Sequence, residues 1–233
     1  MPSLTKTLYF LLSGLLTAIS IGLLGFAMST TWSKTTMDCE GSGINGTAGS
    51  AEITMGLFNG KLIRASCPNF GSEDSFSVFP ALLVIEVTPR VLHGLCLGLL
   101  GLCFLTSALS ILVSLYNSVS NPYETYMGPN GVYTCSSISA FSSVLVLIIY
   151  VLNHILTKMQ EELVPSIAEI PDTSVMLTHK RLEVKTGYFL LIPYAVLSLL
   201  AILLVYLYDH AAYTHRREQE RPTEDAPKEI MMY

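Results

Sequence analysis

The sequence predicts an all-α membrane protein, in which four transmembrane helices form a bundle and the first extracellular loop folds into a small antiparallel β-sheet. Four long stretches contain no Asp, Glu, Lys or Arg, and each approaches the ~20 apolar residues that cross a bilayer. Hydrophobic residues make up 51% of the chain and charged residues 13%, and the mean hydropathy is +0.51. These values lie outside the range of soluble globular domains. Most of the polar remainder falls in one loop, which carries a turn dipeptide typical of β-hairpins.

The predicted membrane domain covers residues 1–208, and a flexible cytoplasmic tail follows at 209–233. The first uncharged stretch is longer than the ~7 to 15 residues of a signal-peptide core, so we expect it to remain as a span. Pro193 should kink the last helix, because proline lacks an N–H and crowds the preceding turn. The four helices are predicted at residues 8–28, 91–116, 132–152 and 187–208.

The large loop at residues 29–90 decides the predicted orientation. It holds the sequon Asn45-Gly46-Thr47 and two cysteines, Cys39 and Cys67. A glycan on Asn45 and a disulfide both belong on the extracellular side. The count of Lys and Arg favours the reverse topology, but that rule weakens for loops of about 60 residues. We therefore expect loop 29–90 to lie outside and both termini to be cytoplasmic.

The cysteines divide into two groups by position. Cys39 and Cys67 lie outside the spans and are predicted to form a disulfide, and the alternative is two free thiols. Cys96, Cys103 and Cys135 lie within or at the edge of spans, where we interpret them as packing residues. Cys135 is also a candidate for palmitoylation.

A β-hairpin is predicted around Asn59-Gly60, because this dipeptide accepts the positive φ angles of a type I′ turn. A two-residue turn at this point would pair Phe58 with Lys61 and Leu57 with Leu62. One face of the hairpin would then be apolar, and either the outer helix ends or a partner protein must cover it. That face comprises Ile53, Met55, Leu57 and Leu62.

Small residues recur at helical spacing within the spans, and we expect them to let helices of the bundle approach closely. These residues are Gly14, Ala18 and Gly22 in the first span, Gly94 and Gly98 in the second, and Ser139 and Ser143 in the third. No ionisable residue occupies the middle of a span, which disfavours transport through a single subunit. No motif of catalysis, cofactor binding, metal binding or nucleic-acid binding is found, and the G-x-G-x-x-G match at residues 41–46 is interpreted as chance.

The connection after the second span contains two turn signals, and its residues resemble the signature of the clarin family. The element Gly56-Leu57-Phe58-Asn59-Gly60, which precedes Cys67, strengthens this resemblance. The signature residues in the connection and the helix after it are Asn121, Pro122, Tyr123, Glu124, Thr125, Gly128, Pro129, Gly131 and Tyr133.

Clarins are similar in turn to the claudin-like tetraspan group, in which a Trp after the first span and a Gly-Leu-Trp element precede a disulfide in a small extracellular sheet. Trp32 matches the first feature, and Gly56-Leu57-Phe58 matches the second with Phe58 in place of Trp. The two loop cysteines are spaced more widely than the claudin pair. The resemblance implies a plasma-membrane tetraspan whose relatives organise the membranes and synapses of sensory cells.

We therefore expect a non-enzymatic membrane organiser, scaffold or adhesion protein. Its expected partners are membrane lipids and unidentified membrane or scaffold proteins, and a homo-oligomer is a further option. An auxiliary subunit of a channel or receptor is the first alternative, and a junction-forming or pore-forming protein is the second. The terminal residues Met231, Met232 and Tyr233 match a ligand of PDZ domains. The alternative for this tail is a solvated segment anchored at the bilayer by Arg216 and Arg217.

Overall fold

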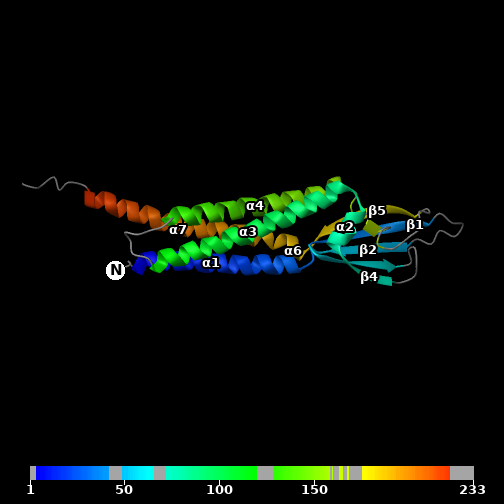
Figure 1. Ribbon diagram of the computed structural model, residues 1–233, viewed down its shortest axis with the longest axis horizontal. Coiled ribbons are helices and arrows are strands. Elements are labelled where there is room, and N and C mark those ends of the chain that lie inside the picture. The colour runs from blue at the N-terminus through cyan, green and yellow to red at the C-terminus, as the bar shows by residue number, and fades with distance from the viewer. Residues whose placement is uncertain are drawn as a thin grey trace, which may run out of the picture.

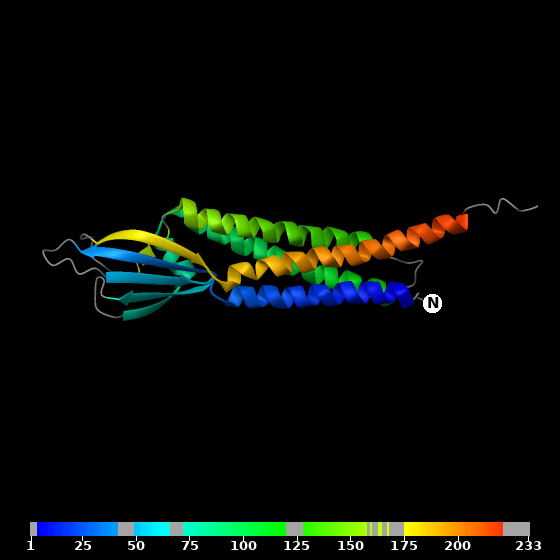
Figure 2. The same ribbon diagram turned by 180° about the vertical axis from the view of Figure 1, so that it is seen from behind.

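The computed structural model describes residues 4–41, 49–65, 72–119, 128–157, 159, 163–164, 167 and 175–220. A long helical bundle forms one end of the molecule and a β-sheet forms the other (Figure 1). The start of α1 and the end of α7 lie at the end away from the sheet (Figure 2). The helices are α1 (Leu4–Ser29), α2 (Val78–Val84), α3 (Val87–Val119), α4 (Gly128–Leu156), α6 (Thr186–Phe189) and α7 (Leu191–Glu220). The strands are β1 (Ser33–Gly41), β2 (Gly49–Met55), β3 (Asn59–Ala65), β4 (Ser72–Ser77) and β5 (Val175–Val184).

The structure confirms the predicted set of long apolar helices. Within the described residues, four helices are long and apolar enough to cross a membrane. The first three begin four residues earlier than predicted, since α1 starts at Leu4, α3 at Val87 and α4 at Gly128. Even α1, with 26 residues, is about 39 Å long at 1.5 Å per residue, which exceeds the ~30 Å hydrocarbon core. At least one end of each of these helices is therefore expected to reach the headgroup region.

The last span is broken near Pro193, as the sequence predicts. Helix α6 ends at Phe189, and α7 begins after Leu190, which connects the two. Phe189 is four residues before Pro193, so its carbonyl lacks the N–H that would normally bond to it. The proline thus explains where the helix is interrupted.

The sheet has five antiparallel strands in the order β4-β3-β2-β1-β5. The first four strands come from the predicted outer loop, whereas β5 comes from the segment between α4 and α7 and was not predicted. A row of charged residues crosses strands β2, β1 and β5. Lys34 of β1 forms an ion pair with Glu52 of β2 at 2.7 Å and lies opposite Glu183 of β5. Glu183 in turn accepts a hydrogen bond from the ammonium group of Lys185 at 2.8 Å. This ammonium lowers the pKa of Glu183.

The predicted pairing of the hairpin is wrong, but three of the four residues of its predicted apolar face do share one face. Leu62 lies opposite Ile53 rather than Leu57, and Met55 lies opposite Gly60, so the connection is longer than two residues. The partner of Leu62 is displaced by four positions, which is an even number, and side chains alternate with a period of two. Ile53, Met55 and Leu62 therefore remain on one buried face, whereas Leu57 lies in the connection and is buried in the core at the junction of sheet and bundle.

That apolar face is covered from within the chain. Val78 and Leu82 of α2 pack on it together with Met159 and Leu163, which follow α4. Leu57 packs instead with Leu24 of α1 and Cys96 of α3, so the helix ends, one of the two covers that the sequence left open, cover this residue. A second core lies at the junction of sheet and bundle, and a third lies between α1, α4 and α7 at the far end.

Candidate functional site

The junction between the sheet and the bundle is built around Trp32, which follows α1 directly. Its side chain is fully buried, and Nε1 donates a hydrogen bond to the carbonyl oxygen of Ala27 at 2.7 Å. The indole meets the edges of Tyr150 and Tyr188 at centroid distances of 4.9 and 6.5 Å. A buried indole needs such a partner for its N–H, and the last turn of α1 supplies the Ala27 carbonyl, which also accepts from Thr30.

The backbone around Trp32 joins three separate segments. Its N–H donates to the carbonyl of Met55 at 2.8 Å, and its own carbonyl accepts from Lys185 at 2.8 Å. The Gly187 N–H donates to Thr31 at 2.9 Å. A Cβ atom at Gly187 would overlap the indole ring and would lie 2.6 Å from its Nε1. Only glycine fits at this point. The two outer segments, residues 29–90 and 157–185, are thus joined through the backbone of Thr31 and Trp32, directly after α1.

The connection between β2 and β3 makes the second attachment to the bundle. Its Gly56 N–H donates to the Asn59 carbonyl at 2.9 Å, which closes the turn. Leu57 is fully buried, and its carbonyl lies 2.9 Å from Nε2 of the buried His93 in α3. The Tyr150 hydroxyl donates to Ser33 Oγ at 3.1 Å and ties α4 to β1. The sheet is thus held by α1, α3 and α4 together.

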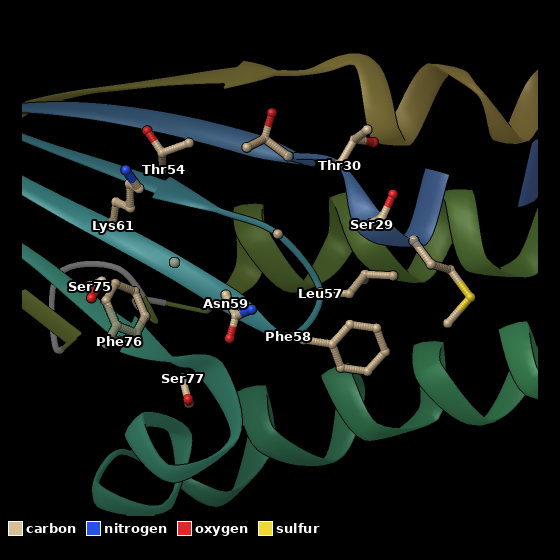
Figure 3. A pocket seen from close by; sticks show the side chains of 14 residues that line it. Ser29, Thr30, Thr54, Leu57, Phe58, Asn59, Lys61, Ser75, Phe76 and Ser77 are labelled. Carbon is tan, nitrogen blue, oxygen red and sulfur yellow. The ribbon is translucent and has the colours of Figure 1, made fainter. Parts of the chain in front are cut away.

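A pocket of about 700 Å³ opens beside this junction (Figure 3). The end of α1, the β2–β3 connection and strand β4 form its walls. Leu57 and Phe58 lie at one end and Lys61 and Thr54 at the other, with Asn59 between them (Figure 3). This volume falls within the ~300 to 1,000 Å³ of small-molecule sites.

The interior of the bundle contains a layer of hydroxyl groups, of which only Ser139 was predicted to lie between helices. Ser107 Oγ lies 2.8 Å from the Tyr194 hydroxyl and 3.1 Å from Ser139 Oγ, and Ser139 also bonds Tyr194. Next to them, Ser110 and Ser136 are 3.1 Å apart. These hydrogen bonds join α3, α4 and α7 across the bundle, which is how polar side chains link helices in a membrane. A signal was available, because serines in the second and third spans recur at helical spacing.

The predicted small-residue faces divide into two outcomes. Ser139 and Ser143 are buried in the bundle, and a Cβ at Gly14 would lie 3.4 Å from the Cβ of Ser114, so close packing is confirmed there. The prediction is wrong for three glycines, since a Cβ at Gly22, Gly94 or Gly98 would meet no atom within 4 Å. Ala18 is also exposed.

The motif residues do not form one cluster. Trp32, Gly56 and Leu57 meet at the junction, and Phe58 lies at the pocket with 48% of its surface exposed. Gly128 begins α4 with a φ of 38°, a conformation that favours glycine, and its carbonyl accepts from Asn117 at 3.3 Å. Pro129, Gly131 and Tyr133 follow within the first turns of that helix.

Several predicted sites lie outside the described residues. They are the sequon at Asn45, the cysteine Cys67, the signature segment Asn121–Thr125 and the terminal Met231–Tyr233. The backbone of Cys39 lies in β1 opposite Gly49, but its side chain is not among those described. The glycan, the disulfide and the PDZ ligand therefore stay predictions.

The charges of the sheet are largely paired within the chain. Besides the Lys34–Glu52 pair, Lys61 bonds Glu73 at 2.9 Å, and the buried Arg64 bonds Asp74. Among the residues that the structure describes, no three His, Cys, Asp or Glu side chains come together as a metal site would require. The features that remain for a function are the fixed junction, the pocket and the outer surface of the sheet.

Comparison with known proteins identifies the relatives of this chain. The sequence model of the Clarin-2-like family matches residues 4–205. Clarin-3 of Mus musculus is 31% identical over 242 residues, and Clarin-3 of Homo sapiens is 29% identical over 235 residues. Both alignments cover 100% of each chain. Clarin-1 of Homo sapiens is 27% identical over 158 residues, which cover 64% of this chain and 67% of that protein.

Proposed function

This chain belongs to the clarin family, and we propose that it is a non-enzymatic organiser of the plasma membrane that gathers partner membrane proteins through its outer domain. It is a multi-pass membrane protein of clarin type. Its four long apolar helices and five-stranded sheet are consistent with the claudin-like tetraspan fold. In this proposal the sheet lies outside the cell, and both termini are cytoplasmic.

The observation that supports an organising role is the fixed position of the outer domain. Both outer segments contribute strands to one sheet, and that sheet is fastened to the bundle at Trp32, Leu57 and Ser33. A domain held in this way presents its surface at a constant height and angle above the bilayer. A scaffold needs this property, because partners that bind a rigid surface lose less conformational entropy than partners that bind a mobile loop.

Two other functions are considered beside the organising role: a pore or junction protein, and an auxiliary subunit of a channel or receptor. A pore would need unpaired charges lining a path, and the pairs Lys34–Glu52, Lys61–Glu73 and Arg64–Asp74 already compensate six charges of the outer domain. This pairing favours an organiser over a pore. An auxiliary subunit of a channel or receptor would use the same bundle and sheet, so only the stoichiometry of the partner separates it from an organiser.

Proximity labelling from the surface of native cells tests the proposal. The wild-type chain should label a recurring group of membrane proteins, and Trp32→Ala, compared at equal surface abundance, should lose them because the outer domain is no longer fixed. Gly98→Ala is the matched control, since its Cβ meets no atom within 4 Å. Co-purification of one stoichiometric channel would indicate an auxiliary subunit, and polymeric strands in freeze-fracture images would indicate a junction protein. Labelling no different from that of an unrelated tetraspan would contradict the organising role.

The proposed orientation has a separate test. Glycosidase treatment and Asn45→Gln should each shift the gel mobility of the protein in the same way. An epitope at Tyr233 should be accessible only after the cells are permeabilised. Detection of that epitope on intact cells would reverse the orientation.

A further inference from the structure

We propose that the pocket beside the junction binds the headgroup and upper chain of one zwitterionic glycerophospholipid from the outer leaflet. The choice of leaflet rests on the proposed orientation, whereas the site itself rests on the geometry of the pocket.

The pocket lies at the height of the lipid headgroups. Its floor includes Met28 and Ser29, the last two residues of α1. No charged residue occurs in the sequence between Lys6 and Lys34, so the apolar span ends at this pocket. Because α1 is about 39 Å long and the hydrocarbon core is ~30 Å thick, at least one end of the helix must reach the headgroups.

The apolar side of the pocket continues the surface that faces lipid. Phe26, in the last turn of α1, is 57% exposed, and Phe58 at the pocket is 48% exposed. Figure 3 shows Phe58 pointing toward the helices rather than along the sheet. An acyl chain that lies along α1 can therefore reach Met28 and Phe58 without leaving an apolar environment.

The polar side of the pocket offers groups suited to a phosphate. Lys61 lines the pocket, and its ammonium has three N–H donors, of which the described contacts use one for Glu73. The side chains of Thr54, Asn59 and Ser75 line the same wall and form no hydrogen bond with any other described residue. These hydroxyl and amide groups can donate to phosphate and ester oxygens.

The charge at the pocket selects the class of phospholipid. Lys61 and Glu73 are opposite in charge, 2.9 Å apart and mostly exposed, so the pair is neutral overall. Exposed pairs of this kind are weak and can share a donor with a ligand. The phosphate of a zwitterionic headgroup can face Lys61 while its cationic group faces Glu73. A headgroup with a net negative charge would place its additional negative charge near the Glu73 carboxylate, which repels it.

The test uses the purified full-length chain in detergent after removal of its lipids. Phosphatidylcholine, and diacylglycerol with the same acyl chains, are added separately, and the retained lipid is counted by native mass spectrometry. We expect one phosphatidylcholine per chain and no retained diacylglycerol. Lys61→Gln should weaken binding by up to about fivefold, the upper end for one exposed charged contact. Lys61→Glu should weaken it further, and Thr54→Trp should fill the pocket and abolish binding.

Lys34→Gln is the matched control, because Lys34 also forms an ion pair in the sheet but does not line the pocket. The Lys61 variants change an exposed side chain, so they test the site even if Thr54→Trp fails to fold. Equal retention by the wild type, Lys61→Glu and Lys34→Gln would overturn the proposal, since the lipid would then bind elsewhere. Retention of as much diacylglycerol as phosphatidylcholine would overturn it as well. So would a dimer of the chain that forms while no lipid is bound.

Discussion

Replacing Gly187 by alanine tests the junction with the smallest change that the chain offers. One methyl group is added, and it would overlap the indole ring of Trp32. The ring cannot move easily, because the indole is fully buried, donates a hydrogen bond of 2.7 Å to Ala27 and is flanked by Tyr150. The added methyl must therefore displace either the ring or the segment that carries β5.

The expected cost follows from overpacking. An extra methyl group in a well-packed core typically costs about 1 to 3 kcal/mol. Gly98→Ala, also in a helix, adds the same methyl where no atom lies within 4 Å. That change should be neutral or stabilise the chain by up to ~1 kcal/mol, because alanine favours helix over glycine.

Two readouts separate a local effect from general unfolding. Trp32 is the single tryptophan of the chain, so its fluorescence reports on the junction alone. Its emission should shift to longer wavelength in Gly187→Ala at temperatures where the helical circular dichroism is unchanged. Thermal unfolding can be followed by thiol labelling, since Cys96 and Cys103 are buried in the bundle.

A double-mutant cycle then tests the physical cause. Trp32→Phe introduces a smaller ring that leaves room for the methyl group, so the cost of Gly187→Ala should shrink in that background. Additive effects would show that the two residues do not contact each other. Equal stability and equal emission of Gly187→Ala and Gly98→Ala would refute the proposed junction.

Three other changes probe separate parts of the molecule. Tyr194→Phe removes one hydroxyl from the bundle but leaves Ser107 and Ser139 bonded at 3.1 Å, so it should cost about 0.6 kcal/mol and no more than ~2 in mixed-micelle unfolding; a cost above that would mean that the layer is more cooperative. Cys39→Ser should reduce surface delivery, because loss of a native disulfide typically costs ~2 to 5 kcal/mol; two free thiols in non-reducing peptide maps of the wild type would exclude the bond. A peptide of the last ten residues should bind a PDZ domain and lose binding when its carboxylate is amidated; no binding across a PDZ panel would leave the tail as a solvated anchor.

The spans were predictable because they depend only on composition along the chain. Their interior was predictable only in part, because α3 carries glycines on its outer side and serines on its inner side. Gly94 and Gly98 have the spacing of a packing motif, yet α3 uses Ser107 and Ser110 to meet its neighbours. Spacing identifies a helix face, but the contacts of the whole bundle decide which face turns inward.

The hairpin shows how a correct local rule can give a wrong register. Asn59-Gly60 has the composition of a two-residue turn, but Gly60 lies within β3. The ring of Phe76 in the opposite strand covers Gly60, and a Cβ there would overlap that ring. The turn closes instead at Gly56, where a Cβ would lie 3.2 Å from the carbonyl oxygens of Thr30 and Asn59. Contacts across the sheet therefore decided the role of each glycine.

Strand β5 was missed because its own sequence gives little sign of a strand. His179, Lys180 and Arg181 are consecutive, so the alternation of apolar and polar residues is interrupted. Its place depends on pairing with β1, which lies more than 130 residues earlier in the chain. The role of Gly187 was hidden for the same reason, since its neighbour Trp32 is equally distant in the sequence.

An engineered disulfide tests two statements together: that both outer segments form one sheet, and that this sheet lies in an oxidising compartment. Lys34 and Glu183 lie opposite each other in β1 and β5, so their side chains share one face. The double variant Lys34→Cys/Glu183→Cys, expressed in cells and mapped without reduction, should contain a peptide that links the two strands. Lys34→Cys/Leu182→Cys places the second thiol on the other face and should contain none. A link in both variants or in neither would contradict the account.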